Sequence, residues 1–308
     1  MTEVARAAVR ADDAAKRRYL ESTGPRRFAR FWREFVHRRP LGTAGAILIV
    51  IMLITAALAD RIAPYDPTEF RFSDLLQGPS LQHLLGTDPF GRDVFTRIVY
   101  GSRTALLVGF TASFVGCTLG LVLGVVGAYL GGRVDQLIQR LMDVLLSFPL
   151  IVIAIAVVAA LGTGEGKIGN VIAAITFPII PRVARVVRSS ALSIVNMPYI
   201  EATRAVGSGA VRIMFRHIAP NVAPLAFLYM TFAVSGAILT EAALSFIGLG
   251  DVNTISWGLM LQDVSQSKAL QAWWWLLPPG LAITLISLAF FLVGRAFDEI
   301  VNPRLRKR

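Results

Sequence analysis

The chain of 308 residues has few of the side chains on which most enzyme sites depend. It contains one cysteine, Cys117, and three scattered histidines, His37, His83 and His217. A single cysteine excludes a disulfide framework and a thiolate metal site, and the sequence contains neither an HExxH nor a GxSxG motif. Residues 162–167, GTGEGK, lack the glycine spacing and the following hydroxyl residue of a phosphate loop. We therefore predict that the chain is not an enzyme and binds no cofactor or metal.

Charged residues are also scarce, at 17% of the chain, whereas 55% of the residues are hydrophobic. This balance, with a mean hydropathy of +0.60, is typical of membrane proteins rather than of soluble domains. Six apolar segments have about the 20 residues that a membrane-spanning helix needs. We thus predict an all-α membrane protein with six transmembrane helices. The expected spans are approximately 41–59, 102–130, 141–161, 169–187, 222–245 and 277–297.

The basic residues are distributed unevenly between alternate loops. With the amino terminus inside, the inner segments 1–40, 131–140, Arg182–His217 and the stretch from Arg295 hold 24 of the 31 Lys and Arg residues. This asymmetry follows the positive-inside rule and predicts that both termini are cytoplasmic. The net charge of +11 then faces anionic lipid, so we expect membrane lipid and no nucleic acid as a partner.

The first 40 residues form a basic tail in this scheme. Within it, aromatic residues recur at helical spacing among arginines over residues 26–39, which predicts an amphipathic helix lying in the membrane interface. The span 41–59 follows as an anchor, then an extracytoplasmic loop over 60–101. A core of the five remaining expected spans covers 102–300, with a cytoplasmic loop at about 188–221, and residues 301–308 form a second basic tail.

Glycine is concentrated in the second expected span. Gly116, Gly120 and Gly124 recur every four residues, a spacing that lets a neighbouring helix approach closely. The pattern predicts tight helix packing, within the chain or against a second subunit.

A polar, basic stretch, EATRAVGSGAVRIMFRHIAPN, separates the fourth and fifth spans. Asn196 and Pro198 before it are typical of a helix start, and Gly207 is typical of a left-handed helix end. Ser208 is placed to cap a second helix, which we expect to end at Pro220. The first, short helix is suited to docking into a groove of a partner protein. An ordinary amphipathic loop is the alternative interpretation.

This stretch resembles the EAA loop of permease subunits of ABC importers. Glu201, Ala202 and Gly207 match its pattern, whereas Thr203 replaces the usual second alanine and Ala219 the usual leucine. The resemblance implies that the loop couples the permease to an ATPase. The coupling residues that it implies are Glu201, Ala202, Thr203, Arg204, Gly207, Arg212 and Pro220.

Residues 83–109, HLLGTDPFGRDVFTRIVYGSRTALLVG, closely resemble a signature of the peptide and nickel branch of these permeases. Asp88 or Asp93, paired with Arg92, could be mistaken for a catalytic set. We favour structural pairs that hold an outer loop against the helices.

Two further runs resemble the same branch, DVLLSFPLIVIAI from Asp143 and EAALSFIGLG from Glu241. We expect Arg140 and Asp143 to pair at i, i+3, and Pro149 to kink the third span, with a structural or a gating role. Glu241 is either a structural residue near the outer end of the fifth span, which we favour, or a substrate or proton site. Trp273, Trp274 and Trp275 precede the last span and are expected to form an interfacial belt.

The resemblance covers about residues 28–305 and implies a type I ABC importer permease fold in the bacterial inner membrane. It implies four partner subunits: a second, homologous permease forming a heterodimer, two cytoplasmic ATPases that bind ATP and Mg²⁺, and an extracytoplasmic substrate-binding protein. Di- or oligopeptides are the expected substrates, with nickel chelates, glutathione and sugar or opine conjugates as alternatives. A stand-alone secondary transporter or channel is a distant alternative. It predicts mid-span carboxylates and an internal repeat, and the sequence shows neither clearly, since only Glu241 comes near to the first.

Overall fold

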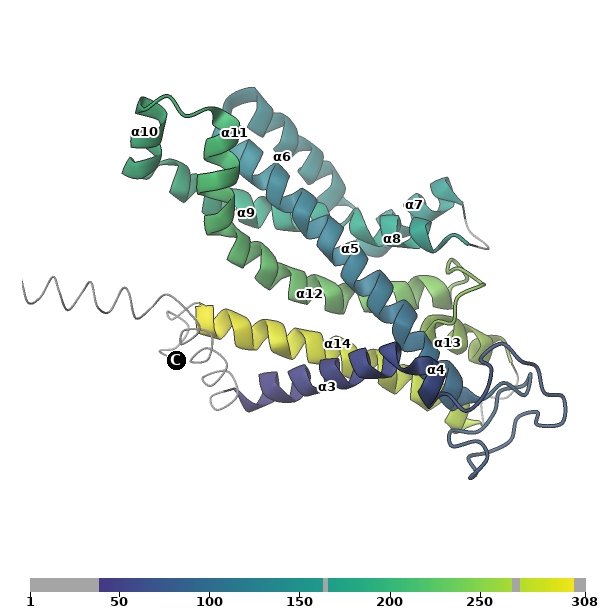
Figure 1. The fold of residues 1–308 in the computed structure, drawn as a ribbon. Helices are drawn as coiled ribbons and strands as arrows, with labels where there is room; N and C mark the ends of the chain where they lie inside the picture. The colour runs from purple at the N-terminus through teal and green to yellow at the C-terminus, as the bar shows by residue number, and fades with distance from the viewer. Residues whose placement is uncertain (1–38, 163–165, 268–271, 302–308) are drawn as a thin grey trace, which may run out of the picture.

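A computed structural model describes residues 39–162, 166–267 and 272–301 (Figure 1). The expected interfacial helix, apart from Arg39, and the C-terminal basic tail lie outside the described residues. Within the described ranges the chain is helical, with one isolated antiparallel bridge between Thr87 and Asp93 and no strand.

Five long helices and several short ones make up the structure. The long helices are α3 (Pro40–Ala57), α5 (Val94–Leu130), α9 (Ile179–Val195), α12 (Ala219–Phe246) and α14 (Trp273–Val301). The shorter elements are α4 (Ala59–Ile62), α6 (Gly132–Ser147), α7 (Leu150–Leu161), α8 (Ile168–Thr176), α10 (Pro198–Ala205), α11 (Ala210–Arg212), the π-helix η1 (Ile213–Ile218) and α13 (Trp257–Gln266). Five stretches of these described residues are long and apolar enough to cross a membrane, or six if the bent pair α6–α7 is one span.

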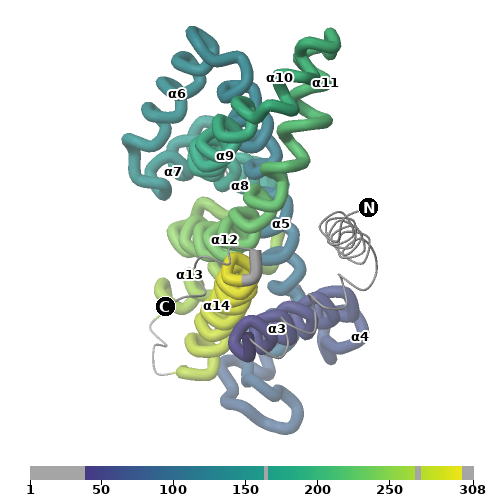
Figure 2. The backbone as a smooth tube through the Cα atoms, turned by 90° about the vertical axis from the view of Figure 1, so that its left-hand side faces the viewer, coloured from purple at the N-terminus to yellow at the C-terminus, as the bar shows by residue number. Residues whose placement is uncertain are grey.

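Helix α5 lies in the middle of the bundle and packs against α9 and α12, while α14 packs against α3 and α12 (Figure 1). Figure 2 shows α6–α9 on one side and the pair α3–α14 on the other. The start of α3, the end of α14 and α10 all lie at the left-hand end of the bundle in Figure 1, here called the α10 end, with α10 well apart from the other two. The loop over 63–93 and α13 lie at the opposite end, here called the loop end.

Two glycines of α5, Gly120 and Gly124, are contact points for α9. A Cβ on Gly120 would lie 2.7 Å from Cβ of Val183, and one on Gly124 would lie 2.7 Å from the backbone oxygen of Ala184. Hydrogen in place of a side chain therefore lets α9 lie directly on α5. The predicted tight packing is confirmed, and it occurs within the chain.

The third predicted span is not one straight helix. Helices α6 and α7 are bent by 97° where Phe148 and Pro149 separate them. Phe148 is extended, with ψ of 145°, because the residue before a proline is disfavoured in the helical region. The expected kink at Pro149 is therefore a complete break, and the first residues of the range 141–161 belong to α6.

Other boundaries differ because capping and helix geometry override simple hydropathy. The second helix starts at Val94, well before the expected 102, since Oδ2 of Asp93 accepts a 2.7 Å hydrogen bond from Thr96 N and caps it. The expected helix end at Pro220 is wrong. Pro220 lies within a continuous helical stretch, because the π-helical η1 joins α11 to α12 without a gap.

Candidate functional site

Helix α10 projects at the α10 end of the bundle, beyond the end of α9 (Figure 1). Pro198 occupies its first turn, and Met197, not Asn196, is in the N-cap position. The Asn196 side chain instead donates to the backbone oxygen of Leu192, 3.1 Å away, and so closes the end of α9. Gly209, rather than the expected Ser208, precedes α11 as its N-cap.

Gly207 ends α10 in the way that the sequence predicts. Its φ is +83°, in the left-handed region that favours glycine. Gly207 N donates to the oxygen of Arg204 at 2.9 Å, and Ser208 N donates to that of Thr203 at 3.2 Å. These two bonds are those of a Schellman motif, which satisfies the last carbonyls of a helix. The chain therefore reverses sharply after α10 and returns toward the bundle as α11.

One face of α10 is attached to the bundle and the other is free. Ile200 is fully buried in the core, and the Arg204 guanidinium lies 4.9 Å from the ring centre of Tyr129 at the end of α5. Glu201 and Ala202 are exposed, and Val206 is 87% exposed. Among the described residues the Glu201 carboxylate has no ion-pair partner. The free face thus combines a carboxylate, a small side chain and an apolar group.

An open groove of about 570 Å³ lies between α10 and the helix that follows. Its walls include small or apolar groups of α10 and three basic side chains of α11 and η1. Thr203, in place of the usual alanine, leaves its hydroxyl satisfied, because Oγ1 donates to the oxygen of Tyr199 at 2.7 Å. Pro220 is not part of the groove. The lining residues are Ala202, Thr203, Val206, Ser208, Arg212, Arg216 and His217.

At the loop end, Asp88 and Arg92 form a structural pair, as expected. Asp93 does not pair with Arg92. Asp88 is 1% exposed and accepts hydrogen bonds from the backbone of Phe90 (2.8 Å) and from Nε of Arg92 (2.5 Å). Arg92 Nη2 also donates to Asp263 of α13, 2.8 Å away. Sequence reasoning missed Asp263, because no local pattern marks a partner so distant along the chain.

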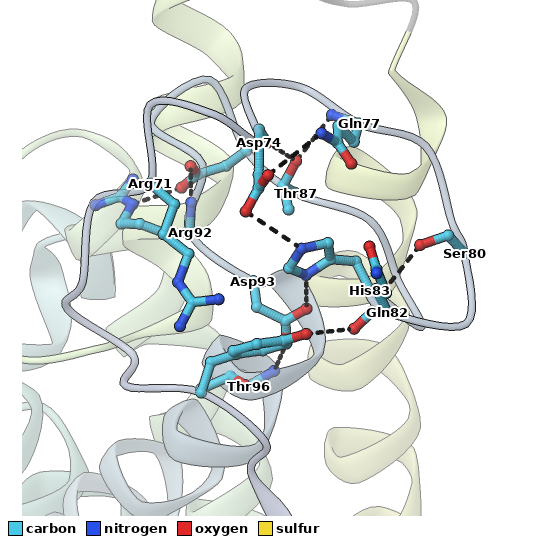
Figure 3. A network of polar contacts seen from close by, with 12 residues as sticks. Arg71, Asp74, Gln77, Ser80, Gln82, His83, Thr87, Arg92, Asp93 and Thr96 are labelled. Carbon is cyan, nitrogen blue, oxygen red and sulfur yellow. Dashed lines mark hydrogen bonds and ion pairs between the residues drawn. The ribbon is translucent and has the colours of Figure 1, made fainter.

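Asp93 belongs to a separate network around His83 (Figure 3). Nδ1 of His83 lies 2.9 Å from Oδ1 of Asp93, and Nε2 lies 3.8 Å from Asp74. The His83 ring is buried, 4.9 Å from the ring of Tyr65. Asp93 therefore joins the loop fold to the start of α5. The sequence offered no signal for His83 beyond its place in the matching run.

A third polar contact at the loop end joins α4 to α5. Asp60 accepts 2.9 Å hydrogen bonds from Nη1 and Nη2 of Arg103 and a 2.8 Å bond from the hydroxyl of Tyr100. These hydrogen bonds, that of Arg103 above all, lower the pKa of Asp60 and so keep this carboxylate ionised.

The expected pairing of Arg140 with Asp143 is wrong, because Asp143 pairs with Arg185 of α9 instead. Arg188, one turn further along α9, binds both oxygens of Asp135, which lies eight residues before Asp143 on α6. The bend at Pro149 turns α7 away, and α6 is left lying along α9.

Glu241 is buried in α12, only 4% exposed. It accepts a 2.7 Å hydrogen bond from Ser245, and the side chain of Ser256 lies close to it. Ser256 is also the N-cap of α13, where its Oγ accepts from Leu259 N. Glu241 thus connects α12 to the start of α13, and it makes no ion pair with the described residues.

The tryptophan belt is only partly as expected. Trp273 is exposed, but Trp275 lies in the core, and Nε1 of Trp274 donates to the oxygen of Thr87 at 3.3 Å. The loop over 63–93 folds onto Trp274, whereas Trp275 packs in the apolar core.

No group of three or more His, Cys, Asp or Glu side chains in the described part of the chain could hold a metal ion. The fold and these contacts define a helical membrane protein with an exposed helix and groove at one end and a polar loop at the other.

Comparison with known families makes the assignment specific. The sequence profile described as the binding-protein-dependent transport system inner membrane component matches residues 116–307, more than half of the chain. The profile of the N-terminal TM domain of oligopeptide transport permease C matches residues 27–79. The chain belongs to the family of inner membrane components of binding-protein-dependent transport systems.

Individual relatives agree with this assignment. The chain is 39% identical over 271 residues to a putative peptide transport system permease protein of Brucella suis, covering 87% of this chain and 90% of that protein. It is 39% identical over 278 residues to the glutathione transport system permease protein GsiD of Escherichia coli O157:H7, covering 90% of each.

A solved structure of the MetNI methionine ABC transporter, in an inward-facing conformation, superposes with a TM-score of 0.53 at 21% identity. It covers 70% of this chain and 98% of that chain, and this likeness shows the fold. The predicted family, fold class and inner-membrane location are confirmed. The chain is a permease subunit of an ABC importer, in which the ATPase is a separate subunit and a binding protein presents the substrate.

Proposed function

We propose that this chain forms half of the membrane pathway of an importer for di- or oligopeptides, and that α10 couples it to ATP hydrolysis. The observation that carries the proposal is the geometry of α10, a short helix with one buried anchor, one exposed face and a sharp glycine end beside an open groove. Such a helix is suited to insertion into a cleft of a partner subunit.

In this scheme the α10 end is cytoplasmic. Arg204, Arg212 and Arg216 lie on α10, α11 and η1, which agrees with the excess of positive charge on the inner side of membrane proteins. Both termini are then cytoplasmic. The loop over 63–93 faces the extracytoplasmic binding protein. A second, homologous permease completes the pathway, and two cytoplasmic ATPases, which bind ATP and Mg²⁺, dock at the two α10 helices.

The helix after the groove provides a direct route by which movement of α10 can reach the other side of the membrane. From Ala210 to Phe246 the chain is helical without a break, and it carries Glu241 near the loop end. A displacement of α10 by the ATPases moves the groove wall, and α12 passes that movement across the membrane. The π-helical η1 lies at the base of this helix, where a local change of register is tolerated. ATP binding closes the ATPases and reorients the spans, and hydrolysis resets them.

Peptides are the substrate class favoured by the oligopeptide permease profile and by the Brucella suis relative. Glutathione is the second candidate, because a glutathione permease is 39% identical to this chain. No observation favours nickel chelates or sugar and opine conjugates. Membership of a binding-protein-dependent family argues against a stand-alone secondary transporter or channel.

The test uses the complete importer, purified through a tag on this chain and reconstituted with its binding protein. We expect a second permease and the ATPases to co-purify, and peptide-loaded binding protein to stimulate ATP hydrolysis. Gly207→Ala forces a side chain into the left-handed region, which costs about 1–2 kcal/mol, and should lower stimulated hydrolysis about fivefold or more. Glu201→Lys reverses the one charge on the exposed face of α10 and should act in the same direction.

Gly209→Ala is the matched control. Gly209 has an ordinary φ of −67° and, like Gly207, has nothing within 4 Å of an added Cβ, so this variant should behave as the wild type. If Gly207→Ala and Glu201→Lys both retain full stimulation and transport, α10 is not the coupling element. If this chain purifies alone and transports without ATP, the importer assignment of function fails as well.

A further inference from the structure

A cavity of about 400 Å³ lies between α7, α8, α9 and α12. Its walls are mostly apolar, and three lining residues have polar side chains, Arg182 of α9 and Tyr229 and Thr240 of α12. The Thr240 hydroxyl is already used, because it donates to the oxygen of Gly236 at 2.8 Å. Arg182 and Tyr229 make no side-chain hydrogen bond with the described residues. Apolar cavities of this size with a few converging polar groups are typical of small-ligand sites.

Arg182 is the unmatched member of a series of three arginines on α9. Arg182, Arg185 and Arg188 are spaced three residues apart, so each lies about one turn from the next. Arg188 pairs with Asp135 and Arg185 pairs with Asp143, both on α6. The third pair is missing because α6 ends at Ser147 and the chain bends by 97° at Pro149.

No other helix around the cavity supplies the missing charge. The sequences of α7, α8 and α9 contain no Asp or Glu, and α12 contains only Glu241. Glu241 is bonded to Ser245 and does not line the cavity. A cation inside a membrane-spanning helix without a partner is costly and is therefore a sign of function. Within the described residues, Arg182 is a cation that faces a cavity and lacks a counter-charge.

We propose that Arg182 binds a carboxylate group of the transported solute while the solute occupies this cavity. The planar guanidinium can donate two parallel hydrogen bonds to a carboxylate, which fixes its orientation as well as its charge. The apolar walls, with Val183 and Phe232 among them, then contact the rest of the solute. This inference rests on the proposed function, since peptides and glutathione each carry a free carboxylate.

The experiment measures ATP-dependent uptake into proteoliposomes that contain the complete importer and excess binding protein. The probes are glutathione and two forms of one dipeptide, with a free C-terminal carboxylate and with a C-terminal amide. We compare the acid-to-amide ratio of uptake rates in the wild type and in Arg182→Gln. The wild-type and Arg182→Gln importers receive the same binding protein. Its own preference for the acid or the amide therefore cancels when the two ratios are compared. We expect the ratio to fall about tenfold or more in Arg182→Gln, by loss of acid uptake with amide uptake unchanged.

Two further variants make the result specific. Arg182→Lys keeps the charge without the planar fork and should retain part of the discrimination. If Arg182→Gln accumulates poorly in the membrane, the ratio is measured in Arg182→Lys instead. Arg185→Gln removes the same charge one turn away, where Arg185 pairs with Asp143 and does not line the cavity, and should leave the ratio unchanged.

An unchanged ratio in Arg182→Gln, in an importer that still takes up peptide, overturns the carboxylate site and leaves the proposed function intact. The same holds if Arg182→Gln lowers acid and amide uptake equally while less of the second permease co-purifies, because the partner of Arg182 is then a carboxylate of that subunit. If the wild type takes up neither the dipeptides nor glutathione, both the proposed function and this inference fail.

Discussion

Arg92 and Asp263 lie 171 positions apart in the chain, yet Nη2 of Arg92 donates a 2.8 Å hydrogen bond to Oδ2 of Asp263. The same guanidinium also binds Asp88, which is buried. The loop before α5 is therefore attached to α13 through one arginine. This contact gives a structural reason for the polar run at the loop end, because its charges neutralise one another where the loop meets the helices.

Arg92→Ala should destabilise the protein strongly, because it leaves the Asp88 carboxylate buried without its counter-charge. Removing one partner of a buried pair costs about 3–5 kcal/mol. Thermal unfolding in detergent, followed by tryptophan fluorescence, measures the change. Arg71→Ala is the control, since the pair of Arg71 with Glu69 is exposed, and its midpoint should hardly move. Equal effects of the two variants would contradict the structural role of Arg92.

Gly120→Ala should weaken the contact between α5 and α9. The added Cβ would lie 2.7 Å from Cβ of Val183 and 3.0 Å from the oxygen of Ile180, so the helices must separate. Overpacking of this kind costs about 1–3 kcal/mol. Gly280→Ala in α14 meets nothing within 4 Å and should be neutral or slightly stabilising. The thermal unfolding midpoints of the two variants measure the difference. A Gly120→Ala midpoint equal to that of the wild type would contradict the close contact between α5 and α9.

Glu241 should tolerate glutamine but not alanine. The Glu241→Gln variant keeps a side-chain oxygen that can accept from Ser245, whereas Glu241→Ala leaves the buried Ser245 hydroxyl without its acceptor. We expect a loss of about 1–3 kcal/mol in stability for Glu241→Ala, and near-normal transport for Glu241→Gln. Abolished transport in a well-folded Glu241→Gln importer would instead support the proton-site or substrate-site interpretation.

The two ion pairs between α6 and α9 should differ in strength. Asp135 and Arg188 have side chains 15% and 28% exposed, against 60% and 51% for Asp143 and Arg185. A double-mutant cycle with alanine at Asp135 and Arg188 should give a coupling energy of about 1–3 kcal/mol, and the cycle at Asp143 and Arg185 less than about 1 kcal/mol. The second cycle is the internal control, because the two pairs join the same helices. Equal coupling energies would show that burial does not decide their strength.

The prediction of α10 succeeded because its determinants are local. Pro198 and Gly207 act through backbone conformations that depend on a few neighbouring residues, so the helix and its left-handed end were predictable. The expected cap at Ser208 and the helix end at Pro220 were wrong, because each depends on how the following helix joins the bundle. The coupling role of the loop remains a proposal.

The prediction of α6 and α7 as one span failed for the opposite reason. Hydropathy counts apolar residues but does not record that Asp135 and Asp143 find arginines on α9, which hold α6 along that helix. From the sequence, Arg182 was placed only at the start of an inner basic segment, since its unmatched position appears only when the other two arginines are paired.

By itself, the sequence determined the helical membrane class, the close approach of some neighbouring helix to the glycines of α5, and the sharp end of α10. These depend on composition, on the absence of a side chain and on backbone conformation, which are properties of single residues or short segments. The tertiary structure alone decided which charges meet, because Arg92 with Asp263 and Asp143 with Arg185 are joined by packing between helices distant along the chain. It also decided that Arg182 faces a cavity without a counter-charge, since an unpaired side chain can be recognised only when all of its neighbours are in place.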